Sequence, residues 1–373
     1  MFTVIVKGTN SCNLDCSYCS LGKKINGKIA DKNRLFDILE FGCKVAKDKV
    51  DPRVNFIFHG GEPTIISLDS YTYAIDRIEN DYPEVKKEYS IQTNAWQLSE
   101  DYIEFLKKYN VKVGVSIDGS EYIHDTERRS KNGEKTFDRV CANIDRMLEK
   151  EIPVSCLMVL TSVALKKDMD YLKFFEERNL HLKINPLLNY GEVYVHPELS
   201  LSENEYADYL IRLYEYILTN SINVSISPID KILNAILSDK KINECTFNAN
   251  CNENFVCIDY EGNIYPCGKY SDLNEYKLGS IYDKSFSFHN LEILQKLIRR
   301  RTINLPVECK NCKFIAMCNA GCNAEASIDG NIEKPPLLCS DYKKLFAYFI
   351  RDGLLLYKQK LEERRKELLK NGI

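Results

Sequence analysis

The most informative stretch of this chain is the sequence Cys12-Asn13-Leu14-Asp15-Cys16-Ser17-Tyr18-Cys19. Its three cysteines have the spacing CxxxCxxC, and they come directly after an apolar run, residues 2–6, and before any helix signal. Thiolates at this spacing can bind one face of an iron–sulfur cube, although a structural cluster normally takes four cysteines. The stretch, which we call the cysteine loop, therefore predicts a cluster with one iron left open for chemistry, as in catalytic metal sites.

The length of 373 residues is enough for one large domain and a smaller one. The net charge of -3 gives no general electrostatic reason to expect nucleic acid. No apolar run is long enough to span a membrane, and Met1 leads straight into a strand pattern instead of a signal peptide. We therefore predict a cytoplasmic protein with no nucleic-acid or membrane partner. In that compartment its 15 cysteines indicate metal ligands, not disulfides.

The first half of the chain alternates β-rich runs with helical patterns. Strands are expected at residues 2–7, 54–58, 89–92, 111–117, 153–160 and 181–185. Helices are expected between them, at residues 32–46, 68–80, 99–109, 136–150 and 166–178. This order predicts an α/β fold with a parallel sheet, a partial (β/α)6 TIM-like barrel. In such folds the active site collects on the loops after the strands, and the cysteine loop follows the first strand.

Polar residues follow several of the other predicted strands. The second strand runs into His59-Gly60-Gly61-Glu62-Pro63, where paired glycines allow a close backbone approach and the carboxylate can accept hydrogen bonds from an amine. Ser116 ends the fourth strand, and Arg128 beyond it can pair with a carboxylate. Each loop alone could be an ordinary turn or a solvated charge. Together they predict a pocket for a small amino acid that has both an amine and a carboxylate.

With these motifs the chain resembles the radical S-adenosylmethionine (SAM) superfamily over roughly its first 220 residues. The resemblance rests on the cysteine loop, with aromatic Tyr18 before its last cysteine, on the Gly60 to Pro63 turn and on the six-strand order. It implies that SAM binds the open iron and is cleaved to methionine and a 5′-deoxyadenosyl radical, which abstracts a substrate hydrogen. It also implies that Tyr18 lies by the adenine, Glu62 near the methionine amine, and Ser116 and Arg128 near the ribose or carboxylate. The alternative for the three cysteines is a zinc half-site.

Cysteines become dense again after residue 244. Between them, residues 255–266 form two β runs around Gly262, a hairpin pattern. On spacing alone these cysteines could also hold a pair of zinc sites. Four further cysteines, Cys43, Cys141, Cys156 and Cys257, lie in predicted helices or strands and are expected to be buried packing residues. The eight candidate ligands are Cys245, Cys251, Cys267, Cys309, Cys312, Cys318, Cys322 and Cys339.

This second region resembles the SPASM domain of peptide- and protein-modifying radical SAM enzymes, and its cysteine order is most similar to that of the anaerobic sulfatase-maturating enzymes. The resemblance implies two auxiliary [4Fe–4S] clusters, and therefore three clusters in the chain. One set would be Cys245, Cys251, Cys267 and Cys322, and the other Cys309, Cys312, Cys318 and Cys339. The expected organisation is a barrel over residues 1–220, a bridge over 221–244, a SPASM domain over 245–345 and a C-terminal helix over 346–373.

One residue departs from the sulfatase-maturase pattern. Those enzymes have an aspartate base directly after the third ligand cysteine of this region, whereas here Gly268 follows Cys267, and glycine cannot transfer a proton. Either Asp272 or Tyr270 takes that role, or the reaction is different. We therefore predict maturation of a ribosomally made peptide, by a thioether, ether or carbon–carbon cross-link or by epimerisation. The alternatives are formylglycine formation on a sulfatase and, from another class, a non-catalytic zinc or iron–sulfur scaffold protein.

The expected partners are a peptide or protein substrate and an electron donor such as flavodoxin or ferredoxin. No leader-binding domain precedes the first strand, so we expect a leader to bind the barrel and bridge, or a separate protein to supply recognition. Ser202 and Glu205 predict a helix start with a capping box, in a helix that runs to about Thr219. The tail from residue 341 has a helical pattern, with an apolar half that packs on the cysteine-rich region and a charged, solvated end.

Overall fold

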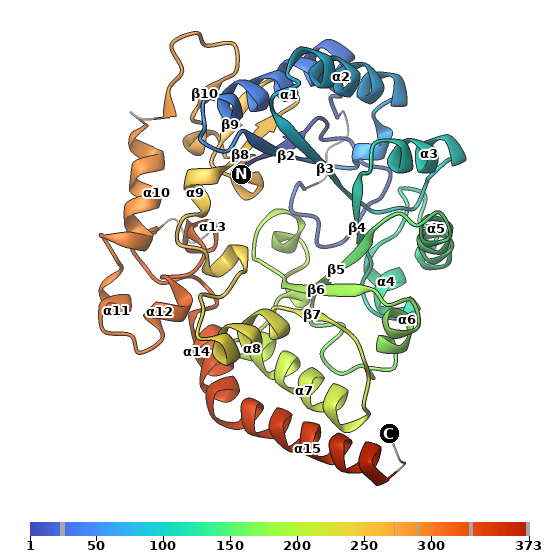
Figure 1. The fold of residues 1–373 in the computed structure, drawn as a ribbon, viewed down its shortest axis with the longest axis vertical. Coiled ribbons are helices and arrows are strands. Elements are labelled where there is room, and N and C mark those ends of the chain that lie inside the picture. The colour runs from blue at the N-terminus through green and yellow to red at the C-terminus, as the bar shows by residue number, and fades with distance from the viewer. Residues whose placement is uncertain (23–26, 272, 289–290, 328–330, 371–373) are drawn as a thin grey trace.

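The computed structural model describes residues 1–22, 27–271, 273–288, 291–327 and 331–370. In these residues one sheet contains all ten strands, in the order β10-β9-β8-β1-β2-β3-β4-β5-β6-β7. Pairing is parallel from β8 through β1 to β7, and antiparallel between β8, β9 and β10. Helices cover the outside of the curved parallel part (Figure 1). This is the α/β partial barrel that the alternating pattern predicts.

The six predicted strands are present, each within a few residues of its expected bounds. They are β1 (Phe2–Lys7), β2 (Arg53–His59), β3 (Lys86–Thr93), β4 (Lys112–Ser116), β5 (Val154–Leu160) and β6 (His181–Pro186). The short strand β7 (Ile226–Ser227) pairs with β6. The remaining strands come from the cysteine-rich region and are β8 (Phe255–Asp259), β9 (Asn263–Tyr265) and β10 (Gly279–Ser280).

Five helices follow the predicted pattern, and one was missed. The outer helices are α1 (Lys32–Lys47), α2 (Leu68–Asp81), α3 (Glu100–Lys108), α4 (Glu121–Glu127), α5 (Phe137–Glu149) and α6 (Leu172–Glu177). Asp31, Ser67 and Ser99 cap α1, α2 and α3 through side-chain oxygens. The short helix α4 was not predicted. Helix α6 is shorter than expected because residues 162–171 form isolated turns with hydrogen bonds between residues three apart, instead of a continuous helix.

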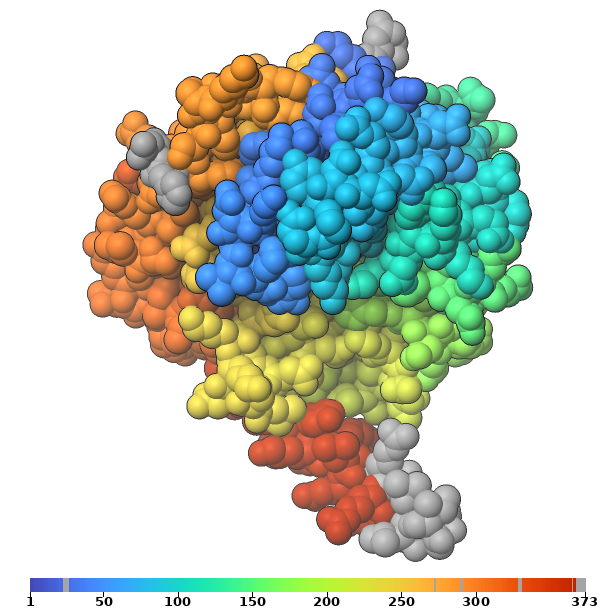
Figure 2. Space-filling model, turned by 45° about the horizontal axis from the view of Figure 1, so that its top comes forward, coloured from blue at the N-terminus to red at the C-terminus, as the bar shows by residue number. Residues whose placement is uncertain are grey.

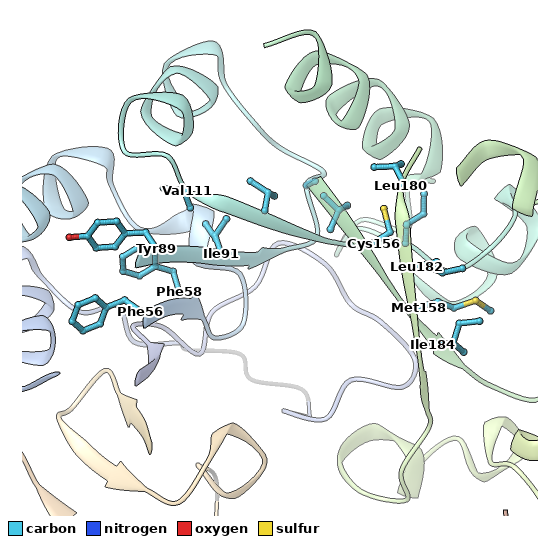
Figure 3. Close-up of a cluster of buried hydrophobic side chains, with 14 of the residues drawn as sticks. Phe56, Phe58, Tyr89, Ile91, Val111, Cys156, Met158, Leu180, Leu182 and Ile184 are labelled. Atoms are coloured by element: carbon cyan, nitrogen blue, oxygen red, sulfur yellow. The ribbon is translucent and has the colours of Figure 1, made fainter. Parts of the chain in front are cut away.

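Because side chains alternate along each strand, one set of residues faces the core and the other faces the cavity. In β2 every second residue is buried, and the residues between them are only half-buried. The buried set, which includes Phe56 and Phe58 (Figure 3), lies between the sheet and the outer helices. Phe58 packs against Tyr71 of α2 with ring centroids 4.7 Å apart. The half-buried residues at the ends of β2 and β3 include His59 and Gln92. They face the inside of the barrel and line a cavity.

The predicted hairpin is confirmed as β8 and β9, with Gly262 at its turn and a φ of +85°. Strand β8 pairs with β1, so the hairpin extends the barrel sheet across the edge that an open barrel leaves at its first strand. The division into domains at residues 220 and 245 stays a prediction. The remaining helices are α7 (Glu205–Thr219), α8 (Ile229–Ser238), α9 (Cys251–Asn254), α10 (Glu292–Thr302), α11 (Val307–Lys310), α12 (Ile315–Cys318), α13 (Asn323–Ser327), α14 (Cys339–Tyr348) and α15 (Leu354–Lys370).

Two expectations about these helices need correction. Helix α7 is capped at Asn204, with a φ of +67°, and not at Ser202, although Glu205 Oε2 accepts the Ser202 N–H at 2.7 Å as half of a capping box. Helix α14 packs on α7 as well as on the cysteine-rich region, since Asp341 accepts the Ala207 N–H at 3.0 Å. Figure 2 shows the following helix, α15, projecting from the body. In the described ranges no helix has the length and apolar character that crossing a membrane requires.

Candidate active site

A cavity of about 330 Å³ lies at the carboxyl ends of the barrel strands, and we call it the rim cavity. Residues at or after the ends of all six strands contribute to its wall, so the site lies where a parallel barrel places it. It brings together every residue that the first half of the sequence suggested, and it encloses a volume suited to a small ligand. These residues are Cys12, Cys16, Tyr18, Cys19, Gly60, Gly61, Glu62, Ser116 and Arg128.

The three thiols of the cysteine loop are partly buried at one end of the rim cavity. Cys12 Sγ accepts the Leu14 N–H at 3.4 Å and lies 3.8 Å from the Asn94 amide nitrogen. Burial raises the pKa of Cys12 to about 11 and also raises the pKa of Cys19. These thiols therefore keep their protons near neutral pH until a metal takes the place of the proton.

The glycine turn after β2 holds the cysteine loop in place. Gly61 N–H donates to Thr9 O at 2.9 Å, and the next residue's N–H donates to Ser11 O at 2.8 Å. A Cβ on Gly60 would lie 2.2 Å from Thr9 O, and Gly60 has a φ of +140°. A Cβ on Gly61 would lie 2.1 Å from Ser11 O. Both glycines line the cavity, but the close approach that requires them is to the segment just before Cys12.

Glu62 is buried, and its carboxylate joins two rim loops. Oε1 accepts from Thr93 Oγ1 at 2.7 Å and from the Thr64 N–H at 3.0 Å, while Oε2 accepts the Asn94 N–H at 2.7 Å. Burial raises the pKa of Glu62, and these hydrogen bonds act in the opposite direction. Oε1 also accepts from Thr64 Oγ1, so of the two oxygens Oε2 has the fewer bonds within the protein and can accept a ligand hydrogen bond.

Asp118 lies behind this wall, where it holds the lining residues Tyr18 and Arg128, and it was not among the predicted site residues. It follows β4, is fully buried, and Oδ2 accepts from both the Tyr18 hydroxyl and Arg128 Nε. Its other oxygen accepts the Val159 N–H at 2.9 Å. The guanidinium carbon of Arg128 lies 5.2 Å from the centre of the Tyr18 ring. The predicted carboxylate partner of Arg128 is thus available within the protein, and Ser116 Oγ accepts from Gln92 Nε2 at 2.9 Å nearby.

The eight later cysteines fall into two groups, with the membership that the SPASM resemblance implies. One group, which we call the inner set, lines a cavity of about 300 Å³ that shares His59, Tyr190 and Lys269 with the rim cavity. The other, the outer set, lines a narrow hollow of about 10 Å³. The inner set is Cys245, Cys251, Cys267 and Cys322, and the outer set is Cys309, Cys312, Cys318 and Cys339.

The thiols are not drawn together as they are around a single ion. Four sulfurs around zinc lie about 3.8 Å apart, given a Zn–S distance of about 2.3 Å. Among the described residues no group of three or more His, Cys, Asp or Glu side chains is arranged to hold one metal ion. Of the four cysteines expected in packing positions, Cys43, Cys156 and Cys257 are buried and Cys141 is partly exposed.

Of the two residues suggested as a base in place of the aspartate after Cys267, the structure describes only Tyr270. Tyr270 is buried and pairs with Ser327 Oγ at 3.2 Å, on the side of the inner set and not in the rim cavity. Asp272 lies outside the described residues. Two residues that sequence reasoning missed do line the rim cavity: Lys269, whose Nζ lies 3.4 Å from Glu325 Oε1, and Glu325 itself. Neither stands in a recognisable motif, so only the fold brings them to the site.

Comparisons with known proteins agree with this geometry. Residues 6–175 match the model of the radical SAM superfamily. The cysteine-type anaerobic sulfatase-maturating enzyme of Clostridium novyi (strain NT) is 29% identical over 357 residues, which are 92% of this chain and 93% of that protein. The serine-type enzyme of Bacteroides thetaiotaomicron is 26% identical over 379 residues, 92% of this chain and 88% of that protein. The solved structure of native anSMEcpe with bound AdoMet has a TM-score of 0.79 and 25% identity, covering 96% of this chain and 99% of its own.

Proposed function

We propose that this chain, which is a radical SAM enzyme of the sulfatase-maturase type, abstracts a hydrogen atom from a residue of a polypeptide substrate. One observation carries the proposal. The rim cavity is lined by the three thiols of the cysteine loop and also by Thr246, Lys269 and Glu325, which come from the segments of the inner set. A substrate side chain in this cavity would lie close to the segments that carry both groups of thiols.

The donors fit the cluster that the superfamily implies. Cys12, Cys16 and Cys19 would hold a [4Fe–4S] cluster, because thiolates are the preferred ligands of such clusters and three of them leave one iron for SAM. No fourth cysteine of the described residues lines the rim cavity. When bound, the cluster and SAM supply the 5′-deoxyadenosyl radical.

The residues of the cavity wall would position SAM. Glu62 can accept hydrogen bonds from the methionine amine through Oε2, and Tyr18 can lie beside the adenine. Asp118 holds Tyr18 and Arg128 in one arrangement before SAM arrives, which lowers the ordering cost of binding. Ser116 and Arg128 are then placed toward the ribose or carboxylate.

The inner and outer sets would hold two further [4Fe–4S] clusters, which makes three in all. Four thiols in each set leave no iron open, and this favours electron transfer or structural support over substrate binding. The inner cavity has room for such a group, at about 300 Å³. The outer hollow is much narrower, so its thiols must move apart when a cluster binds.

Two reactions are candidates for the polypeptide substrate. The full-length similarity to cysteine-type and serine-type maturases supports oxidation of a cysteine or serine to formylglycine, and Glu325 supplies a carboxylate in the cavity that can accept the proton. Gly268 favours the second candidate, which is cross-linking or epimerisation of a ribosomally made peptide, because no carboxylate directly follows Cys267. An electron donor such as flavodoxin or ferredoxin would serve either reaction.

Anaerobic assays test these proposals in order. Reduced, reconstituted protein with SAM should form 5′-deoxyadenosine, whereas Cys16→Ala should not. Equal amounts from both proteins would overturn the radical reaction. With peptides from sulfatases, mass spectrometry after hydrazine trapping should detect an aldehyde at cysteine or serine. A cross-link or an epimerised residue in a peptide encoded nearby, with no aldehyde in sulfatase peptides, would select the second candidate.

A further inference from the structure

Two consecutive arginines of α10 are buried between the inner and outer sets. Arg300 and Arg301 are each 3% exposed, whereas Arg299, directly before them, is exposed to solvent. A guanidinium keeps its charge at any pH a protein tolerates, so the fold buries two adjacent cations here. In the sequence this run of three arginines is indistinguishable from a solvated helix face.

Arg301 contacts segments of both sets. Its Nη1 donates to Cys251 Sγ of the inner set at 3.3 Å, and its Nη2 donates to Thr246 O at 2.7 Å, next to Cys245. Its Nε donates to Asn319 O at 3.1 Å, directly after Cys318 of the outer set. One side chain thus fixes the loops that carry ligands of both sets and gives a charged hydrogen bond to one thiol.

Arg300 lies beside Arg301 and binds different atoms. It donates to Ala320 O and to Asn323 Oδ1, each at 3.0 Å, and to Ile332 O and Lys334 O. Asn323 follows Cys322 of the inner set. Burial lowers the pKa of Arg300, while Cys309 and Cys322, one cysteine from each set, act in the opposite direction. Arg300 therefore lies within electrostatic reach of both groups of thiols.

Neither guanidinium forms an ion pair with a carboxylate of the described residues. Their partners are carbonyls, an amide and a thiol. A buried charge is strongly unfavourable unless an opposite charge compensates it. The nearest source of negative charge is the cysteines themselves, because four thiolates outweigh the charge of a [4Fe–4S] core and make each filled set an anion.

We propose that Arg300 and Arg301 are the counter-charge shared by the inner and outer sets, and that Arg301, through Cys251, raises the reduction potential of a cluster on the inner set. The proposal rests on the three clusters of the proposed function. Reduction adds negative charge, so a nearby cation and an N–H to a ligand sulfur favour the reduced form. Lys269 Nζ, 3.9 Å from Cys322 Sγ, adds a second cation on the inner side. A cluster on the inner set therefore accepts an electron more readily than one on the outer set.

The test compares four variants of the full chain, reconstituted anaerobically with iron and sulfide. Arg301→Gln removes the charge, Arg301→Lys keeps it, Arg300→Gln removes the neighbouring charge, and exposed Arg299→Gln is the matched control. Redox titration followed by electron paramagnetic resonance should show a lower potential for one auxiliary signal in Arg301→Gln, a smaller shift in Arg301→Lys and none in Arg299→Gln. An unchanged potential in Arg301→Gln, or an equal shift in Arg299→Gln, would overturn the proposal.

A second measurement separates charge compensation from simple packing. If the arginines serve the filled sets, Arg301→Gln should lower the melting temperature of reconstituted protein more than that of metal-free protein. Equal losses in both forms mean that Arg301 only holds loops together, and the proposal fails. Should Arg301→Gln lose iron, recovery of iron in Arg301→Lys supports the role of charge, and no recovery contradicts it. Wild-type protein that binds only about four irons, the content of one [4Fe–4S] cluster, removes the auxiliary clusters and this proposal with them, while SAM cleavage tests the proposed function separately.

Discussion

The cysteine loop and the outer set use the same donor atoms in opposite surroundings. The loop places three thiols at the end of a cavity of about 330 Å³, next to an ion pair and several polar side chains. The outer set places four thiols around a hollow of about 10 Å³ whose lining residues are mainly apolar. The comparison indicates that the space and the polar groups around the thiols, more than the thiols themselves, distinguish a site with room for a small ligand from one without it.

The largest effect should come from removing one thiol in each region. Cys16→Ala should reduce 5′-deoxyadenosine formation to background, because two thiolates cannot hold the cluster that binds SAM. Cys312→Ala should leave that rate within about tenfold of wild type, since the outer set is outside the rim cavity. Chromatographic quantification of 5′-deoxyadenosine checks both. An equal loss of 5′-deoxyadenosine formation in the two variants would contradict the distinction between the cysteine loop and the outer set.

Two buried aspartates give the next comparison. Asp118→Asn should lower the free energy of unfolding by about 3–5 kcal/mol, because it leaves the buried Arg128 charge unpaired. Asp259→Asn, in the hairpin of the cysteine-rich region, should cost about 1 kcal/mol, since Asp259 accepts mainly uncharged N–H donors. Denaturant titration of both variants measures the difference. A larger loss for Asp259→Asn would contradict the central place of Asp118.

Two glycines allow a smaller but well-matched test. Gly60→Ala should cost about 1–3 kcal/mol, because the methyl group meets Thr9 O and the backbone has a φ that L residues rarely adopt. Gly268→Ala should be nearly neutral, because its Cβ would lie 3.6 Å from Ile5 Cδ1, an ordinary contact. Thermal unfolding compares the two. If Gly268→Ala is the more harmful, then the contact of its Cβ with Ile5 is not the ordinary one that the geometry indicates.

The last comparison concerns pH. Glu127 is buried near the cysteine loop, and burial raises the pKa of Glu127 to about 8, while Thr161 acts in the opposite direction. The folded protein therefore holds this proton more tightly than the unfolded chain, and stability from this group is lost as pH rises from about 4.5 to about 8.

Glu127→Gln carries no such proton, so its stability should fall less with increasing pH, and above about pH 8 it should exceed that of wild type by several kcal/mol, since each unit of pKa difference is worth about 1.36 kcal/mol. Unfolding measured at about pH 5 and about pH 9 checks the sign. The exposed Glu308→Gln, beside the outer set, is the control and should show no such trend. A wild-type protein that gains stability over the same range would contradict the assignment.

Local patterns were enough to predict much of the barrel and of the site. Strand and helix periodicity depends on near neighbours, which explains why β1 to β6 and most outer helices were found. Cysteine spacing indicated the cluster ligands for the same reason. Helix α4 and the Asn204 cap were missed because a seven-residue helix and a single residue with a positive φ leave little periodic signal.

The residues that were missed are those whose partners lie far away in the sequence. Asp118 binds Tyr18, which is 100 residues away, and Lys269 and Glu325 meet at 3.4 Å only because two ligand loops pack against each other. Arg300 and Arg301 belong to a charged run whose burial follows from the packing of α10 between the two sets. Burial is a property of the whole fold, so no local pattern predicts which charges lose their water.

The donors could be named from the sequence alone: three thiols at a spacing that predicts an open iron, a glycine turn after the second strand, and eight later thiols. Their surroundings follow only from the packing of the chain. The rim cavity and the cavity of the inner set share lining residues, whereas the outer set surrounds only a small hollow. The buried Arg301 donates to a thiol and not to a carboxylate. The reason is that ligand identity is set by covalent neighbours, whereas electrostatics and access depend on which distant segments exclude water from the site.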